Sequence, residues 1–464
     1  MPFFLLVPIF WVGFSMNELF FWLHWVGFVR LCFLYQVGRR GHFAKDFLWP
    51  CWGVFLAVYS VCFSWLLIRG LGTYVLAILL FSPFFPLFFL LHHLFTSKVR
   101  SPLVKVAAAF GIFFVLESLM SRIPAMESIG LDFFFQPPAG VLCVLKFIHF
   151  EVWSSWVFAT CFAISCWLHE KGIRSLVLPG ALVGGMVVLV MFAHVQNESL
   201  GNGTGRTVKV ALVQHNLPYL EAWRVGHLEE IKQQYRELAL KASLGGPDLV
   251  IFPLYNLPGD VYRDPSFLLE LAGIAKCPII AASHVPIKAG DELFDQGILS
   301  LALLYAPEGK MRDIYQAVET PPFYSHYAKK AKKHRVIRGP FGKLGVLLCY
   351  EDMVPRLARD AARNGAKVLV ALSNPGLFAQ MAIIYYELLQ DQIRAAENNL
   401  PLLRLSPNGY SAWIDRTGKI VQKAKLNTEE ILQVELSDIG PGEIGGEDPK
   451  NPLLEEIERP MPQS

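Results

Sequence analysis

The residue with the clearest chemical potential is Cys349, which lies in the stretch GVLLCYED at residues 345–352. Its apolar run predicts a buried strand that ends at Cys349, and a helix is expected to follow at once. Such a strand-to-helix elbow presents a side chain beside backbone N–H groups, where the pKa of a thiol is lowered and a nucleophilic thiolate is favoured. A cysteine at the end of a buried strand is more often an inert core residue than a nucleophile. The surrounding sequence must therefore distinguish these two roles.

The elements that must position Cys349 predict an α/β layered domain. Short β-branched runs alternate with helical runs along the second half of the chain, and this alternation is typical of sheets covered by helices. Strands are expected at residues 208–214, 248–252, 278–283, 298–305, 344–349 and 368–372, with a hairpin-like pair at 402–405 and 411–415. Helices are expected at residues 219–242, 352–364 and 383–398.

The first half of the chain has a different composition, which predicts a membrane-embedded unit. Of the 464 residues, 53% are apolar and only 17% are charged, whereas soluble proteins average about a quarter charged. Residues 1–200 contain 12 Lys and Arg and 8 Asp and Glu, while the remaining residues contain 30 and 31. The net charge of +3 is too small to indicate a nucleic-acid partner.

About seven membrane spans are expected, because each span needs about 20 mostly apolar residues. They lie at residues 2–15, 18–36, 47–68, 72–95, 103–120, 150–168 and 174–195. Residues 131–148, which Pro137 and Pro138 interrupt, are expected to form a loop at the membrane surface, with an eighth helix as the alternative. Lys and Arg gather in the loops after spans two, four and six, which predicts a cytoplasmic N-terminus and a periplasmic second half.

Cysteine usage and the linker agree with this division. Six of the eight cysteines lie in the apolar half, and no CxxC pattern occurs, so neither a zinc site nor a disulfide framework is indicated. The polar, glycine-rich residues 196–206 are expected to link the two parts. The domain is then expected to span residues 207–437, and the acidic residues 438–464 are expected to form a flexible tail.

Consecutive motifs give the second half a family resemblance. GVLLCYED is followed by ARNGAKVLVALSNPGLF at residues 362–378 and by QIRAAENNLPLLRLSPNGYSAWIDRTGKI at residues 392–420. VALVQHNLP and DLVIFPLYNLPGD precede them. The series resembles the carbon–nitrogen hydrolase (nitrilase) superfamily, and with the N-terminal spans the chain is similar to the bacterial apolipoprotein N-acyltransferase family. The resemblance implies an αββα sandwich in the periplasm, an acyl chain moved from phospholipid to a lipoprotein N-terminus, and neither cofactor nor metal.

The same resemblance implies a Glu–Lys–Cys triad, from which this chain departs. The family's general base should follow Phe252-Pro253, where the chain has Leu254, and the family's lysine falls on Ala317. If the alignment is right, Leu254, Ala317 and Cys349 converge in space. A later family glutamate falls on Ser325, and a family histidine falls on Tyr386 or Glu387.

Three charged residues of the family pattern are kept, and other residues are candidates to replace the missing ones. Glu351 follows the nucleophile position, and Arg394 and Glu397 lie three apart on one helical face, where they can pair. Lys329, Lys330, Lys332, Lys333 and Glu319 are the candidate replacements. The basic residues 329–338 fit more simply against phospholipid phosphates or solvent.

Two interpretations of the function stay open. The first is a multi-pass inner-membrane protein that has lost the family's catalysis and has a binding or assembly role, with phospholipid and a lipoprotein or other envelope protein as partners. The second is a divergent but active N-acyltransferase that works through a Cys349 thioester, with Glu319, Glu351 or a nearby lysine recruited. General-base assistance typically contributes 10²–10⁴-fold to a rate, so the double loss favours the first interpretation.

Overall fold

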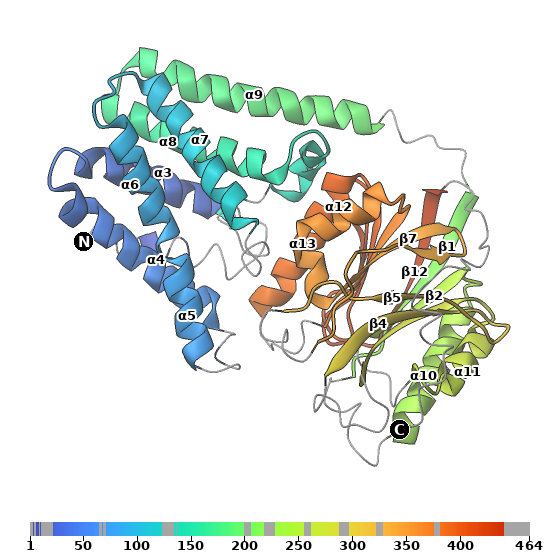
Figure 1. Ribbon diagram of the computed structural model, residues 1–464. Helices are drawn as coiled ribbons and strands as arrows, with labels where there is room; N and C mark the ends of the chain where they lie inside the picture. Colours follow the sequence, from blue (N-terminus) through green and yellow to red (C-terminus); the bar gives the residue numbers. More distant parts are fainter. Residues whose placement is uncertain are drawn as a thin grey trace. The chain divides into compact units, whose positions relative to one another are not determined.

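The computed structural model describes residues 22–64, 71–122, 137–198, 206–217, 228–254, 261–286, 297–321, 328–374 and 381–439, with residues 3, 6–8, 10, 67, 134 and 135. The chain forms two compact units that meet in the sequence between Glu198 and Ser199, here called the helical unit and the sandwich unit (Figure 1). Most of the first expected span, residues 199–205 of the expected linker and the tail beyond residue 439 lie outside the described residues.

The helical unit contains the elements that the apolar runs predict. Its described helices are α3 (Trp22–Gly38), α4 (Trp49–Cys62), α5 (Leu71–Phe81), α6 (Phe84–Thr96), α7 (Pro102–Met120), α8 (Phe150–Glu170) and α9 (Ile173–Glu198), with a π-helix at Ala44–Leu48 and a 3-10 helix at Ala139–Lys146. By length and composition, four described segments could cross a membrane: Leu71–Thr96, Pro102–Met120, Phe150–Glu170 and Ile173–Asn197. Helices α3 and α4 coincide with two further expected spans but are shorter, so the count of seven stays a prediction.

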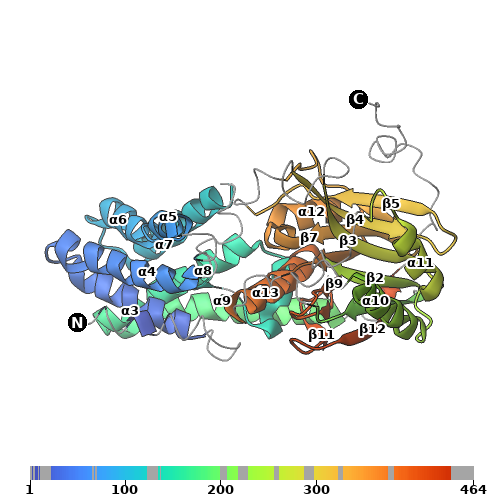
Figure 2. The ribbon, with the colours of Figure 1, turned by 90° about the horizontal axis from the view of Figure 1, so that it is seen from below.

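Aromatic side chains fill the interior of the helical unit. Phe28, Phe85 and Phe158, from α3, α6 and α8, are fully buried. The ring of Phe28 lies 4.9 Å from that of Phe85 and 5.8 Å from that of Phe158. Helix α8 contacts α3, α7 and α9 and is therefore the central helix, with α9 packed along it (Figure 2).

The described part of residues 131–148 packs into this core and forms no eighth long helix. The rings of Phe135 and Phe28 lie 4.6 Å apart between centroids, and the indole of Trp153 donates a hydrogen bond of 2.9 Å to the Phe135 carbonyl. The 3-10 helix that follows has only eight residues, far short of the roughly 20 that a span needs.

The sandwich unit consists of two six-stranded sheets within the described residues. The first sheet has the order β12-β1-β2-β3-β4-β5 and the second has the order β11-β10-β9-β8-β7-β6. The strands are β1 (Arg206–Gln214), β2 (Leu249–Leu254), β3 (Ile279–Pro286), β4 (Ile298–Tyr305), β5 (Met311–Gln316), β6 (Ile337–Gly339), β7 (Gly342–Leu348), β8 (Val368–Leu372), β9 (Leu402–Leu405), β10 (Ala412–Ile414), β11 (Ile420–Lys423) and β12 (Glu430–Ile439). The helices are α10 (Leu228–Ser243), α11 (Ser266–Ala275), α12 (Pro355–Arg363) and α13 (Met381–Asn398).

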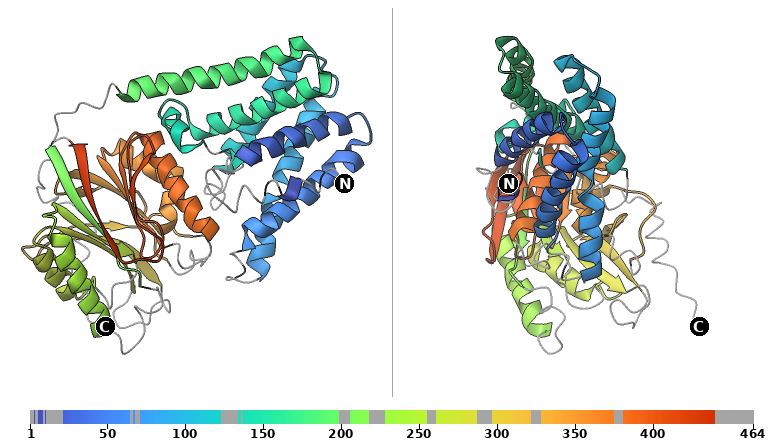
Figure 3. Two further views of the ribbon diagram at one scale, coloured as in Figure 1. Left: turned by 180° about the vertical axis from the view of Figure 1, so that it is seen from behind. Right: turned by 90° about the vertical axis from the view of Figure 1, so that its left-hand side faces the viewer.

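Alternation along the strands builds four layers. In β1, Val210 and Leu212 belong to the apolar core between the sheets, whereas Ala211 belongs to the core under α10 and α11. In β7, Val346 faces the core between the sheets, and Leu347 belongs to the core under α12 and α13. Figure 3 (left) shows the two helix pairs on opposite sides of the sheets. The expected αββα sandwich is confirmed.

Strand β7, which leads to Cys349, lies unusually close to α12 at one point. A Cβ placed on Gly345 would lie 2.6 Å from the Ala361 Cβ and 2.9 Å from a methyl carbon of Leu369. Only glycine fits there without displacing its neighbours. The contact anchors the strand that carries the candidate nucleophile.

Candidate active site

Cys349 follows β7 at an elbow, but the element after it differs from the expected one. A short 3-10 helix, Cys349–Met353, comes first, and α12 begins only at Pro355. The expectation of an α-helix from residue 352 is therefore wrong, because proline favours the first turn of a helix. Cys349 itself has a φ of 53°, and a non-glycine residue held in this left-handed region stores about 1–3 kcal/mol of strain. Neighbouring contacts must hold it there.

The Glu351 carboxylate supplies such contacts. Its Oε2 atom accepts hydrogen bonds from the Leu348 N–H and from the Tyr315 hydroxyl, each at 2.8 Å. Its Oε1 atom accepts hydrogen bonds from the Val318 N–H at 2.6 Å and from the Glu319 N–H at 3.0 Å. The fully buried Glu351 side chain therefore fastens the elbow to the residues that follow β5.

These four hydrogen bonds bear on whether Glu351 can act as a general base. Burial raises the pKa of Glu351 to about 7, and the backbone N–H groups that donate to it hold the rise in check. All four hydrogen bonds go to groups other than the thiol. The geometry fits a positioning role for Glu351 better than proton transfer.

The two positions on which the family's charges are expected to fall are apolar and buried. Leu254 ends β2, Ala317 follows β5, and both belong to the apolar cluster between the sheets. Cys349 is partly buried and packs against the same cluster. A register shift in β2 lies between Ile251 and Leu254, which brings Leu254 into this core. The side chains at these two positions offer the thiol neither a base nor a cation.

The basic residues after β5 have other surroundings. Lys329, Lys332 and Lys333 are exposed. The Lys330 ammonium pairs with the Glu319 carboxylate at 2.8 Å, and Glu319 also pairs with Arg356 of α12. Recruitment of one of these lysines or of Glu319 therefore stays a prediction that no contact among the described residues supports.

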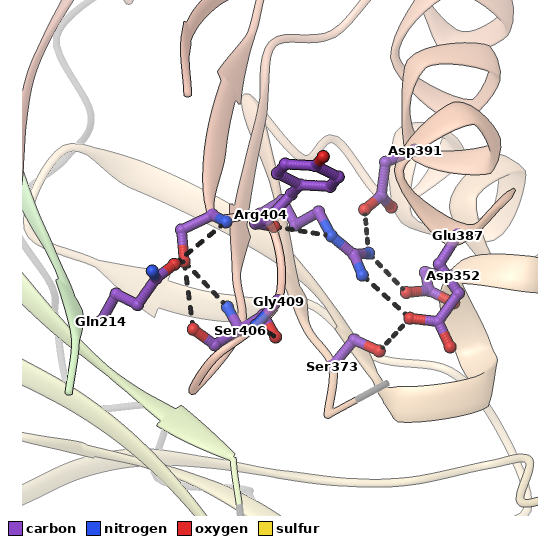
Figure 4. A network of polar contacts seen from close by, with 10 residues as sticks. Gln214, Asp352, Ser373, Glu387, Asp391, Arg404, Ser406 and Gly409 are labelled. Atoms are coloured by element: carbon purple, nitrogen blue, oxygen red, sulfur yellow. Dashed lines mark hydrogen bonds and ion pairs between the residues drawn. The ribbon is translucent and has the colours of Figure 1, made fainter. Parts of the chain in front are cut away.

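A buried ion network lies close to the elbow, and the sequence did not predict it. Arg404 of β9 is fully buried, and its guanidinium contacts three carboxylates (Figure 4). The nitrogen–oxygen distances are 3.2 Å to Asp352, 2.5 Å to Asp391 and 2.8 Å to Glu387. The remaining Nε–H donates to the Tyr410 carbonyl at 3.0 Å. One cation thus ties the elbow to α13.

Three carboxylates around one guanidinium leave an excess of negative charge. Burial, then the neighbouring carboxylates, raise the pKa of Asp352 well above its usual range. Burial raises the pKa of Asp391 to about 6, against the opposing effect of Arg404. Among the described residues, one oxygen each of Asp352 and Asp391 has no hydrogen-bond partner. Burial and the excess of negative charge therefore favour protonation within this network.

Glu387 brings this network next to Cys349. Strands β7 and β8 are parallel, and Leu348 is the register partner of Leu372, so Cys349 and Ser373 follow neighbouring strand ends. The Ser373 hydroxyl donates a hydrogen bond of 2.6 Å to Glu387 Oε2. Parallel register and this bond place the Glu387 carboxylate at the strand end from which Cys349 emerges.

The thiol is more basic than the sequence predicts. Burial raises the pKa of Cys349 above its ordinary range, and the negative charges of Glu387 and Asp352 raise it further. The expected lowering by a helix N-terminus is therefore wrong. The single 3-10 turn is short, and the Tyr350 N–H that lowers the pKa is outweighed by burial and the carboxylates. Cys349 is a protonated thiol near neutral pH, so its chemistry requires a base.

Arg394 and Glu397 lie close together on α13. The Arg394 guanidinium and the Glu397 carboxylate lie 2.9 Å apart, and Arg394 also donates to Gln390 at 3.0 Å. The expected Arg394–Glu397 pair is confirmed. Within the described residues, no group of three or more His, Cys, Asp or Glu side chains is arranged to hold a metal ion.

Comparison with known proteins gives this fold a family. The sequence model of the carbon-nitrogen hydrolase family matches residues 209–440, half of the chain. The apolipoprotein N-acyltransferase of Geobacter metallireducens is 28% identical over 263 residues, which cover 52% of this chain and 49% of that relative. The apolipoprotein N-acyltransferase of Haemophilus ducreyi is 24% identical over 257 residues, 50% of each chain. This chain spans about half the length of these curated relatives.

Relatives without the N-acyltransferase name also match. A probable nitrilase of Schizosaccharomyces pombe is 26% identical over 256 residues, covering 50% of this chain and 87% of that protein. Among solved structures, Saccharomyces cerevisiae Nit3, a member of branch 10 of the nitrilase superfamily, is 25% identical. That similarity covers 50% of this chain and 90% of Nit3, with a TM-score of 0.40.

Proposed function

Because this chain belongs to the carbon–nitrogen hydrolase family, we propose that it is an N-acyltransferase-like protein of the bacterial envelope that no longer performs rapid acyl transfer. Its role is to bind an acyl chain, from phospholipid or from a lipoprotein, in the sandwich unit. The apolar helices hold it in the inner membrane, and the sandwich unit lies in the periplasm. The name of its curated relatives supports this proposal, and so do the four long apolar segments among the described residues.

The observation that carries the proposal is the burial of two apolar residues, Leu254 and Ala317, at the positions expected to match the family's charged residues. Leu254 and Ala317 are almost fully buried in the cluster against which Cys349 packs. Without a base at the first position and a cation at the second, acylation should be slowed by at least about 10²-fold. An apolar wall beside a thiol remains well suited to the hydrocarbon of an acyl chain.

A phospholipid that carries both an alkyne and a diazirine tests the proposal on the purified full-length chain in detergent. We expect illumination to crosslink the probe to the sandwich unit, and we expect no thioester in the dark on the time scale of an intact Glu–Lys–Cys site. Intact-mass measurement detects the thioester, and peptide mass mapping after digestion locates the crosslink. Rapid dark labelling that Cys349→Ala abolishes would overturn the proposal, and so would the absence of crosslinking.

The double variant Leu254→Glu with Ala317→Lys is the matched gain-of-function control. If the wild type lacks only the two charges, this variant should form the dark thioester faster than the wild type. Adding Cys349→Ala to it should remove that label again.

A slow, divergent acyl transfer through Cys349 is the second candidate function. The observation that favours it is the φ of 53° at Cys349, an elbow that Glu351 holds through its hydrogen bonds with the N–H groups of Leu348 and Val318. Binding of an acyl chain alone would not require strain at this residue, whereas strained residues cluster at sites of chemistry.

A further inference from the structure

We propose that Glu387 is the general base for Cys349, so that any acyl transfer by this chain uses a carboxylate from α13 instead of the family's glutamate after β2. This inference rests on the second candidate function and adds a catalytic residue to it. The family's base would approach from the first sheet, whereas Glu387 belongs to the second sheet's side of the site.

The first support is position. Cys349 and Ser373 are neighbours just beyond the register pair Leu348–Leu372, and the Ser373 hydroxyl holds Glu387 Oε2 at 2.6 Å. Arg404 holds the same oxygen at 2.8 Å and also reaches Asp352, three residues after Cys349. Two independent connections, one through β8 and one through β9, thus bring Glu387 to the elbow (Figure 4).

The second support is the way in which Glu387 is held. Within the described residues, both hydrogen bonds of Glu387 go to Oε2, and neither of them occupies Oε1. One carboxylate oxygen is fixed by a hydroxyl and a guanidinium while the other is left for a proton, as a positioned general base requires. The side chain is nearly fully buried, which excludes bulk water as a competing proton acceptor.

The third support is the effect of neighbouring charged groups on the Cys349 thiol. The charged groups that act most strongly on Cys349 are Glu387, Asp352 and Glu351, in that order of strength. Asp352 pairs with Arg404, and Glu351 is occupied by four hydrogen-bond donors. Of the three carboxylates, Glu387 therefore acts most strongly on the thiol and keeps Oε1 outside its described hydrogen bonds.

The chemical step balances with these groups and a carboxylic ester. Glu387 takes the proton from Cys349 Sγ while the sulfur attacks the acyl carbonyl carbon, and the C–S bond forms. The ester C–O bond then breaks, and the leaving alkoxide receives the proton from Glu387. A neutral alcohol departs, the thioester remains on Cys349, and Glu387 is ionised again. Ser373 and Arg404 are positioning residues that keep the carboxylate in place.

The test separates two roles of Glu387: accepting the thiol proton, and raising the thiol pKa through its negative charge. Loss of the first role slows acylation, whereas loss of the second speeds alkylation. In Glu387→Gln the loss of a negative charge next to Cys349 should lower the thiol pKa. Alkylation by iodoacetamide, which needs only the thiolate, should then become about two- to tenfold faster near neutral pH. Slow thioester formation from the alkyne phospholipid, followed over days, should instead fall at least about tenfold, because the base is gone.

Glu397→Gln is the matched control. It removes a carboxylate of the same helix that is only 8% exposed and pairs with Arg394 instead of Arg404, and Glu397 is not among the groups acting most on the thiol. We expect it to leave both the alkylation profile between pH 6 and 10 and the slow thioester rate within about twofold of the wild type. Ser373→Ala should lower the slow rate less than Glu387→Gln does.

Three results would overturn the inference. They are equal slow acylation in Glu387→Gln and the wild type, a parallel fall of alkylation and acylation in Glu387→Gln, and no slow thioester in the wild type. The last result would leave the proposed binding function standing. Rapid acylation of the wild type would instead overturn the proposed function. Whether that acylation falls in Glu387→Gln would then still test the assignment of Glu387 as the general base.

Discussion

Glu351 and Val318 are joined by a hydrogen bond of 2.6 Å between side chain and backbone, although 33 residues separate them in the sequence. Val318 directly follows Ala317, on which the family's lysine is expected to fall, and Glu351 lies two residues after Cys349. The bond therefore holds the elbow at Cys349 and the residues around Ala317 in one fixed arrangement. The chain has kept this arrangement although Ala317 carries no charge.

Glu351→Gln should destabilise the sandwich unit strongly. The amide would present an NH₂ group to backbone N–H donors, so at least one buried donor would lose its acceptor, at about 1–3 kcal/mol. We expect the midpoint of thermal unfolding of the full-length chain in detergent to fall by roughly 3–10 °C.

The matched control is Glu270→Gln, which removes an exposed carboxylate paired with Arg236 at 2.6 Å. Exposed ion pairs contribute about 0–1 kcal/mol, so its midpoint should move by no more than roughly 3 °C. Equal shifts in the two variants would mean that Glu351 does not hold the elbow.

Charges introduced at Leu254 and Ala317 should be coupled. Leu254→Glu alone and Ala317→Lys alone each place a charge in an apolar cluster without a partner, which is costly. If the two positions converge beside Cys349, the double variant should be more stable than the sum of the single effects predicts, by about 1–3 kcal/mol. Chemical unfolding of all four proteins measures this coupling, and strict additivity would contradict the convergence.

Much of the fold follows from local sequence, because apolar runs with clear ends define strands. The strands β4, β8 and β9 begin and end at the residues expected from their hydrophobic runs. Strand β12 is not predicted above, although Leu432, Val434 and Leu436 alternate with polar residues as in a half-buried edge strand. Its partner β1 lies more than 200 residues earlier, so no local signal connects them.

The site was predictable only where a motif marks it. Cys349 was found from its motif, whereas the Glu387–Arg404 network depends on pairing between strands. Ser373 and Glu387 are 14 residues apart, and Arg404 and Asp352 are 52 apart, so neither contact has a sequence signature. A buried arginine in an otherwise apolar strand, LLRL at residues 402–405, is the one signal that could have indicated buried carboxylates.

The topology prediction can be tested without any assumption about the site. The distribution of Lys and Arg in the expected loops predicts that the chain after the last span is periplasmic. A reporter that is active only in the periplasm should therefore be active when fused after Gly201, and one fused after Arg40 should be inactive. The reverse pattern would place the sandwich unit in the cytoplasm.

Two buried groups should make the stability of the sandwich unit depend on pH in opposite directions. Burial raises the pKa of Asp391 to about 6, so its contribution to stability is complete below about pH 4 and is lost as the pH rises through about 6. Burial lowers the pKa of His215 to about 3, so its contribution is complete above about pH 6.5 and is lost as the pH falls. Relative to the wild type, Asp391→Asn should therefore gain stability as the pH rises from about 4 to 6, and His215→Gln should gain stability as the pH falls from about 6.5 to 4. Thermal unfolding of the full-length chain across this range measures both slopes, and curves parallel to the wild type would show that neither group is perturbed by burial.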